Sequence, residues 1–209
     1  MKSKLLLMML LVGILLLSVS LYQNFVLARA DFYTVFSLGM FLLLLAVYHA
    51  LPSARLFRNW RSADILRFFI VLTVFSILID LVGMSLGYWT YPHYGVQDIA
   101  RKYLFEWSVA LLYHMLCLLI GREIFAFLGF NDKISFLLSL LVFVTLIGFL
   151  TESLNLQVHS WQVVKMPLSN RKIGDYFLVF QTIGYWLMAL IPYYIYRITE
   201  SGIYRQKDF

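Results

Sequence analysis

Long apolar runs separated by short polar connections make up almost the whole chain. A helix needs about 20 apolar residues to cross the hydrocarbon core of a membrane. Six runs approach that length, so we expect six transmembrane helices at residues 5–22, 33–51, 68–89, 106–121, 134–156 and 177–196. The pattern predicts an all-α, polytopic membrane helix bundle that forms one integral membrane domain over 1–209. Its second part would be two tandem helical hairpins, 68–124 and 134–196.

Composition supports a membrane protein and argues against a soluble domain. The chain is 62% hydrophobic and 13% charged, with a mean hydropathy of +0.81, whereas soluble domains are about 45–50% apolar. Its net charge of +6 is spread over the loops, where it favours attraction to anionic lipid headgroups. We therefore expect membrane lipids, and no nucleic acid, as partners. The single cysteine, Cys117, excludes an internal disulfide.

The first apolar run has an alternative interpretation. Lys2 and Lys4 before it, and Ala28-Arg-Ala30 after it, also fit a cleavable signal peptide. A run of about 18 residues is closer to a spanning helix, and we interpret it as the first span. Cleavage would leave five spans and place the new N-terminus outside.

The distribution of basic residues predicts the orientation. With six spans both termini lie on one side, which would carry eleven basic residues against six on the other. The eleven are Lys2, Lys4, Arg55, Arg58, Arg61, Arg67, Arg122, Lys133, Arg197, Arg205 and Lys207. Because positive charge collects on the inner side, we expect a multi-pass cell-membrane protein with cytoplasmic N- and C-termini.

Two acidic helix ends, one in the third span and one in the fifth, have the same pattern. Asp80 and Glu152 are each followed nine residues later by a tryptophan, Trp89 or Trp161. The full set pairs Thr73 with Thr145, Ser76 with Gly148, Asp80 with Glu152, Gly83 with Asn155, Gly87 with His159 and Trp89 with Trp161. These positions follow one stripe of a helix and predict an internal repeat. At 1.5 Å per residue, each acid would lie about 13 Å below its tryptophan.

A carboxyl group at such depth needs compensation. In its charged form it costs at least about 2.5–3.5 kcal/mol, which protonation or a polar cleft between the hairpins would relieve. A neutral carboxylic acid in a dry site is a proton donor, and two acids that face each other could share a proton. The structural alternative is that Asp80 and Glu152 are hydrogen-bonding groups that hold helices together.

The residues around the two acids differ. Gly83 and Gly87 form a small-xxx-small surface that lets another helix approach closely, and we predict helix packing there. The second segment places Asn155 and His159 at these positions, which gives a polar stripe with Glu152 and favours chemistry.

The fourth span adds Glu106 and His114, eight residues apart and so on roughly one side of a helix. The candidate catalytic residues are Asp80, Glu106, Glu152, His114 and His159. The candidate substrate-binding residues are Trp89, Tyr113, Asn155 and Trp161. His93, His114 and His159 lack a tight ligand pair such as H-x-x-x-H, so we expect neither a metal nor another cofactor.

One segment resembles a known family. Residues 52–107 contain Pro52, Asp80, Gly87-Tyr-Trp89-Thr-Tyr-Pro92, Gly95 and Leu104-Phe-Glu106-Trp. They resemble one repeat of the small membrane lycopene cyclases of the heterodimeric or fused type. That resemblance implies an acid before a Gly-x-Trp-x-Tyr segment, matched by Asp80, and a later Pro-x-Glu-Glu signature of which Glu106 matches one glutamate. Leu104 stands where the family has proline, so the signature is not intact.

Three functional hypotheses follow. The first is an enzyme that acts on an isoprenoid or other lipid by acid catalysis from intramembrane carboxylates. The second is a non-catalytic accessory or scaffold subunit that packs against a membrane protein partner. The third is a proton-coupled carrier, since repeats with acids near the membrane midplane also occur in transporters.

Overall fold

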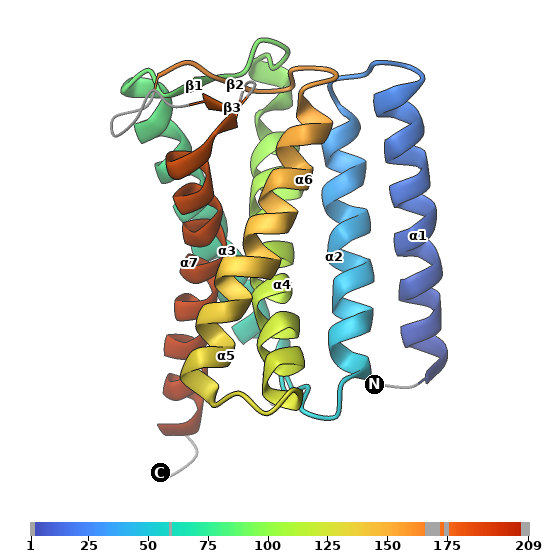
Figure 1. Ribbon diagram of the computed structural model, residues 1–209, viewed down its shortest axis with the longest axis vertical. Coiled ribbons are helices and arrows are strands. Elements are labelled where there is room, and N and C mark those ends of the chain that lie inside the picture. The colour runs from blue at the N-terminus through green and yellow to red at the C-terminus, as the bar shows by residue number, and fades with distance from the viewer. Residues whose placement is uncertain (1–2, 59, 166–171, 174–175, 206–209) are drawn as a thin grey trace.

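The protein is an all-α bundle, as the sequence predicts. A computed structural model describes residues 3–58, 60–165, 172–173 and 176–205. The helices, shown in Figure 1, are α1 (Ser3–Phe25), α2 (Phe32–Ala50), α3 (Ser62–Ser85), α4 (Ser108–Phe127), α5 (Asp132–Ser139), α6 (Thr145–Asn155) and α7 (Leu178–Arg205). Within this part of the chain, five helices are long and apolar enough to cross a membrane.

Short elements join the helices or cover one end of the bundle. Two π-helical segments, η2 (Arg101–Trp107) and η3 (Leu140–Val144), make Arg101–Phe127 and Asp132–Asn155 continuous helices. The strands are β1 (Trp89–Thr90), β2 (Gln162–Val163), β3 (Lys172–Ile173) and β4 (Tyr176–Phe177), and η1 (Val96–Asp98) is a single 3-10 turn. β1 pairs antiparallel with β2, and β3 with β4.

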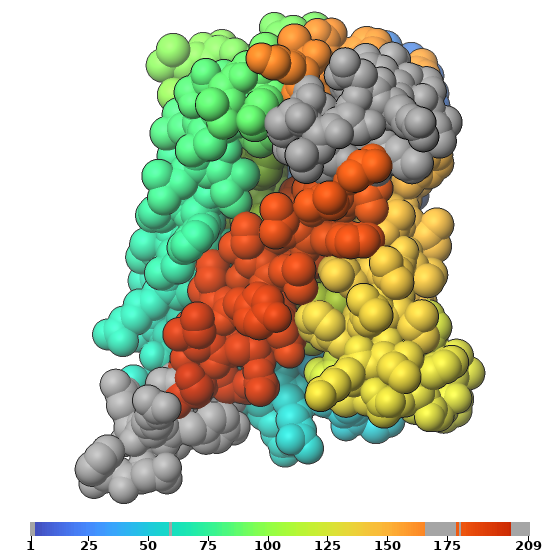
Figure 2. Space-filling model, turned by 60° about the vertical axis from the view of Figure 1, so that its left-hand side comes forward, coloured from blue at the N-terminus to red at the C-terminus, as the bar shows by residue number. Residues whose placement is uncertain are grey.

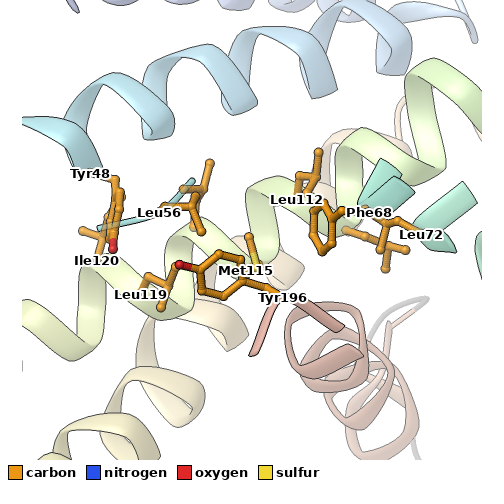
Figure 3. Close-up of a cluster of buried hydrophobic side chains, with 11 residues drawn as sticks. Tyr48, Leu56, Phe68, Leu72, Leu112, Met115, Leu119, Ile120 and Tyr196 are labelled. Carbon is orange, nitrogen blue, oxygen red and sulfur yellow. The ribbon is translucent and has the colours of Figure 1, made fainter. Parts of the chain in front are cut away.

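Helix α4 is the centre of the bundle. All fourteen residues from Ser108 to Gly121 are buried, and α4 contacts α2, α3, α5 and α7. Figure 3 shows one of the resulting clusters, in which Met115 of α4 lies near Phe68 of α3 and Tyr196 of α7. A helix that is apolar on every side has this buried position.

Both ends of α3 differ from the predicted span. The sequence predicted a helix over 68–89, but α3 begins at Ser62 and ends at Ser85. Gly87 then adopts a φ of +71°, a left-handed conformation that glycine tolerates and that ends helices. The chain therefore turns back, and Trp89 lies in β1 rather than on a helix.

The ends of the bundle agree with an even number of helical passes. Figure 1 places the start of α1, the α2–α3 connection and the end of α7 at one end, with β1 and β2 at the other. Among the basic residues that carry the orientation argument, Lys2, Arg171 and Lys207 lie outside the described residues.

Helix α1 lies at the edge of the bundle beside α2 (Figure 1). The two backbones meet at glycines: a Cβ on Gly13 would lie 2.8 Å from the Leu43 nitrogen, and one on Gly39 would lie 3.0 Å from the Leu17 nitrogen. Such close approach through small residues is common between membrane helices.

We expect Gly13→Ala to destabilise the protein by about 1–3 kcal/mol, since the new methyl group meets backbone atoms that cannot move aside. The free energy of unfolding in detergent measures this. Gly184→Ala is the matched control, because a Cβ there has no atom within 4 Å. Equal effects of the two substitutions would contradict the proposed α1–α2 contact.

Candidate functional site

Asp80 is fully buried near the end of α3 and is surrounded by donors. Its Oδ2 accepts from Lys102 Nζ at 2.6 Å and from Tyr103 Oη at 2.7 Å. Its Oδ1 accepts from Trp89 Nε1 at 2.8 Å and from Tyr91 Oη at 2.6 Å. Four donors, one of them an ammonium group, suit a charged carboxylate that holds other groups in place.

The sequence predicted that each tryptophan lies about 13 Å above its acid along the helix. In the structure, the chain turns after each helix and the tryptophan side chain contacts the acid. Trp89 donates to Asp80, and Trp161 Nε1 donates to the Glu152 carboxylate at 3.2 and 3.3 Å. Both pairs are nine residues apart. β1 and β2 pair directly after these turns, with Trp89 opposite Val163. The two segments thus make the same contact, while the duplication itself stays a prediction.

Glu106 occupies η2 and is 2% exposed. Its carboxylate accepts from the Thr34 and Tyr94 hydroxyls and lies 3.4 Å from Arg101 Nε. The Arg101 guanidinium also lies over the Tyr94 ring, 5.2 Å from its centroid. Glu106 is therefore a second acid with a basic partner.

Tyr91 and Tyr94, which lie in the loop between α3 and η2, stay protonated. Burial raises the pKa of both phenols, and the neighbouring carboxylates Asp80 and Glu106 raise it further. Both hydroxyls therefore serve as hydrogen-bond donors to these acids at neutral pH.

Glu152 of α6 is 9% exposed and has only neutral partners among the described residues. Tyr185 Oη of α7 donates to Oε1 at 2.7 Å, and Trp161 donates its indole N–H. Gln181 and Asn155 also hydrogen bond to it. No described basic side chain forms a salt bridge with it.

Glu106 and Glu152 line one cavity of about 140 Å³ between the helices. Seven aromatic side chains contribute to its wall: Tyr33, Trp89, Tyr91, Tyr94, Trp107, Trp161 and Tyr185. Ile79, Ala110, Val163, Gly184 and Met188 add apolar surface, and Gln181 adds an amide. A mostly apolar, aromatic cavity with a few polar groups is the usual form of a small-molecule site.

A second, more open cavity of about 280 Å³ lies beside the first. Arg29, Asp31, His93, Asp98 and Arg101 line it with Ala30 and Tyr94. Tyr94 belongs to both cavities, and its partners Glu106 and Arg101 belong to one each. These three side chains therefore separate the inner apolar cavity from the outer polar one.

Four predicted site residues line the inner cavity: Glu106, Glu152, Trp89 and Trp161. Asp80 does not, so the two acids that meet there are Glu106 and Glu152 rather than Asp80 and Glu152. Asp80 accepts hydrogen bonds from Trp89 and Tyr91 and so positions two side chains that line the cavity.

Tyr113 and His114 lie in the core of α4, outside that lining. Tyr113 Oη is 2.9 Å from Tyr33 Oη and 3.3 Å from Thr151 Oγ1. His114 stacks against Tyr113 and Tyr185, and its Nδ1 is 2.7 Å from the Ala110 oxygen. Its Nε2 has no hydrogen-bond partner among the residues that the structure describes. Tyr113 and His114 therefore contact Tyr33 and Tyr185, two side chains that line the cavity, without lining it themselves.

The remaining predicted residues shape the turns. Asn155 hydrogen bonds to both backbone groups of Trp161 and so positions its ring. His159 is exposed, with a φ of 51°. Gly83 packs against the Trp89 ring and Gly87 has no atom within 4 Å of a Cβ. Gly83, inside α3, leaves room for the Trp89 ring, and Gly87 lies in the turn after α3. Packing of another helix at these two glycines stays a prediction.

The histidines do not come together. His93 is exposed at the outer cavity, whereas His114 is buried in the core. Across the residues that the structure describes, no three His, Cys, Asp or Glu side chains are placed to hold a metal ion.

The sequence did not identify the basic partner of Asp80 or most of the tyrosines that line the inner cavity. Lys102 lies beyond the turn that follows Asp80, and the sequence analysis counted it only as a loop charge, although a charged group that is buried is usually paired with an opposite charge. Tyr33, Tyr94 and Tyr185 come from three separate segments, and no local pattern connects them.

Comparison with known proteins gives no relative: no family model, no curated protein and no solved structure matches the chain. The resemblance to lycopene cyclases therefore stays a prediction.

We expect Asp80→Asn to destabilise the protein by about 3–5 kcal/mol, because it leaves the Lys102 ammonium buried without its counter-ion. Lys102→Met should cost a similar amount. The double variant Asp80→Asn with Lys102→Met should be more stable than the sum of the single effects predicts. Unfolding free energies in detergent measure this cycle, and strict additivity would contradict the ion pair.

Proposed function

We propose that this protein is a membrane enzyme that acts on the hydrocarbon part of an isoprenoid or other lipid by acid catalysis. The observation that carries the proposal is the position of Glu152 at an apolar, aromatic cavity with only neutral partners described around it. A buried carboxyl group whose described partners are all neutral is suited to act as a proton donor.

Glu152 is the proton donor in this proposal, in place of Asp80. Asp80 and Glu106 each have a basic side chain close by, Lys102 and Arg101 respectively, whereas no described basic side chain forms a salt bridge with Glu152. Glu106 also lines the cavity, and its partner Tyr94 lies between the inner and outer cavities.

The reaction conserves atoms. The Glu152 carboxyl proton is transferred to one carbon of a double bond, whose π electrons form the new C–H bond and leave a carbocation at the neighbouring carbon. The Glu152 carboxylate then takes a proton from an adjacent carbon, which restores both the acid and a double bond. Attack of a second double bond before that loss closes a ring. Either product is an isomer of the substrate, and aromatic faces stabilise the cation on the way.

The proposal includes the predicted location: a multi-pass cell-membrane protein with cytoplasmic termini. Five long apolar helices support a membrane location. The common end of α1, α7 and the arginine-containing α2–α3 connection supports the orientation (Figure 1).

Deuterium incorporation tests the reaction. We expect the purified protein, incubated in D₂O with lipids from its native membrane, to place deuterium in one lipid class without other change of composition. Glu152→Gln, which keeps an oxygen acceptor for Tyr185, should lower incorporation by about 100-fold or more. High-resolution mass spectrometry of extracted lipids makes the measurement.

The control is Glu123→Gln, an acid that lines neither cavity, and it should incorporate deuterium like the unmodified protein. Undiminished incorporation in Glu152→Gln would refute the assignment. No incorporation, together with a stoichiometric protein partner in the preparation, would favour the scaffold function.

Cysteine labelling tests the orientation. Cys117 is the single, buried cysteine, so Cys117→Ala gives a cysteine-free background. In intact cells a membrane-impermeant maleimide should label His93→Cys and not Ser53→Cys, both of which are exposed sites. Permeabilised cells should label both. The reverse pattern would place the termini outside.

A further inference from the structure

Glu152 differs from the other two buried acids in its charge balance. Asp80 has Lys102 Nζ at 2.6 Å and Glu106 has Arg101 Nε at 3.4 Å. The described partners of Glu152 are an indole, a phenol and two amides, all neutral. In its ionised form, Glu152 leaves the inner cavity with a negative charge that no described basic side chain balances.

The wall of the cavity is suited to a positive charge. Aromatic faces attract cations electrostatically, most strongly where water is excluded. One of these rings already does so from the side that faces Asp80, since Lys102 Nζ lies 3.3 Å from the centroid of the Tyr91 ring. Trp161 and Tyr185 donate to the Glu152 carboxylate through their N–H and O–H groups and also line the cavity, so aromatic rings and counter-ion border the same space.

The size of the cavity limits what enters. Its volume is about 140 Å³, and an apolar cavity of roughly 150 Å³ in another protein binds benzene. A single trimethylammonium group is of comparable size. Helices α3 and α7 lie side by side on the face seen in Figure 2 and contribute Ile79, Gly184 and Met188 to the wall. An attached alkyl chain would pass between these two helices.

We infer that the inner cavity is a binding site for organic cations, specifically an alkyl ammonium ion held between the Glu152 carboxylate and the faces of the surrounding aromatic rings. The inference goes beyond the proposed reaction, because binding needs the carboxylate, the rings and the space but no turnover. An enzyme that forms a carbocation in this cavity and a protein that only binds amines would share the site.

A matched pair of ligands tests the inference. The probe is hexyltrimethylammonium, and its control is the uncharged isostere in which carbon replaces the nitrogen. Calorimetric titration uses the full chain in nanodiscs of zwitterionic lipid, with empty nanodiscs subtracted. We expect the cation to bind at least about tenfold more tightly than the isostere, as one desolvated cation–π contact alone provides.

Two variants locate the site. Glu152→Gln should bind both ligands with similar, weak affinity, whereas Glu123→Gln should keep the preference for the cation. Gly184→Leu should bind neither ligand, because the new side chain points into open space in the cavity wall. Thermal unfolding of each variant verifies the fold.

Equal affinities for the cation and the isostere in the unmodified protein would overturn the inference without any variant. A cation preference that survives in Glu152→Gln would also overturn it. Deuterium incorporation without a cation preference would refute this inference alone, and a cation preference without incorporation would refute only the proposed reaction.

Discussion

A carboxyl group removed from water has to be met by hydrogen-bond donors or by opposite charge. This requirement determines how one end of the bundle is built. Asp80 gathers Lys102, Tyr103, Trp89 and Tyr91 from three different segments, so α3, β1 and η2 are held together by one side chain. Glu152 does the same for α6 and α7 with neutral groups. Asp80 is thus met by one cation and three neutral donors, and Glu152, among the described residues, by neutral donors alone.

The core of the bundle and its polar end are stabilised by different kinds of contact. Around α4 the contacts are apolar and tolerate several arrangements of similar volume. At the polar end the four donors around Asp80 are each paired with one carboxylate oxygen, and a shift of one side chain leaves another unsatisfied. The inner cavity lies at the boundary of these two regions, which explains why its wall is apolar and aromatic yet carries two carboxyl groups.

The lengths of the apolar runs predicted the helices well, because a run of about 20 apolar residues has few alternatives to a membrane helix. The acids Glu106 and Glu152 and the tryptophans Trp89 and Trp161 were also found from sequence, since charge in an apolar run is conspicuous. The partner of Asp80 was not: Lys102 reaches it only after the chain has turned at Gly87 and entered η2. The contribution of Tyr33 and Tyr185 depends on how α2 and α7 are rotated in the bundle, which no local pattern specifies.

The pairing of β1 with β2 joins two loops that are separated in the chain by α4, α5 and α6. Each loop also carries a tryptophan bonded to an acid below it. A continuous set of hydrogen bonds thus runs from Asp80 through Trp89, β1 and β2 to Trp161 and Glu152. Helices α3 and α6 are therefore joined through their following loops as well as through the bundle.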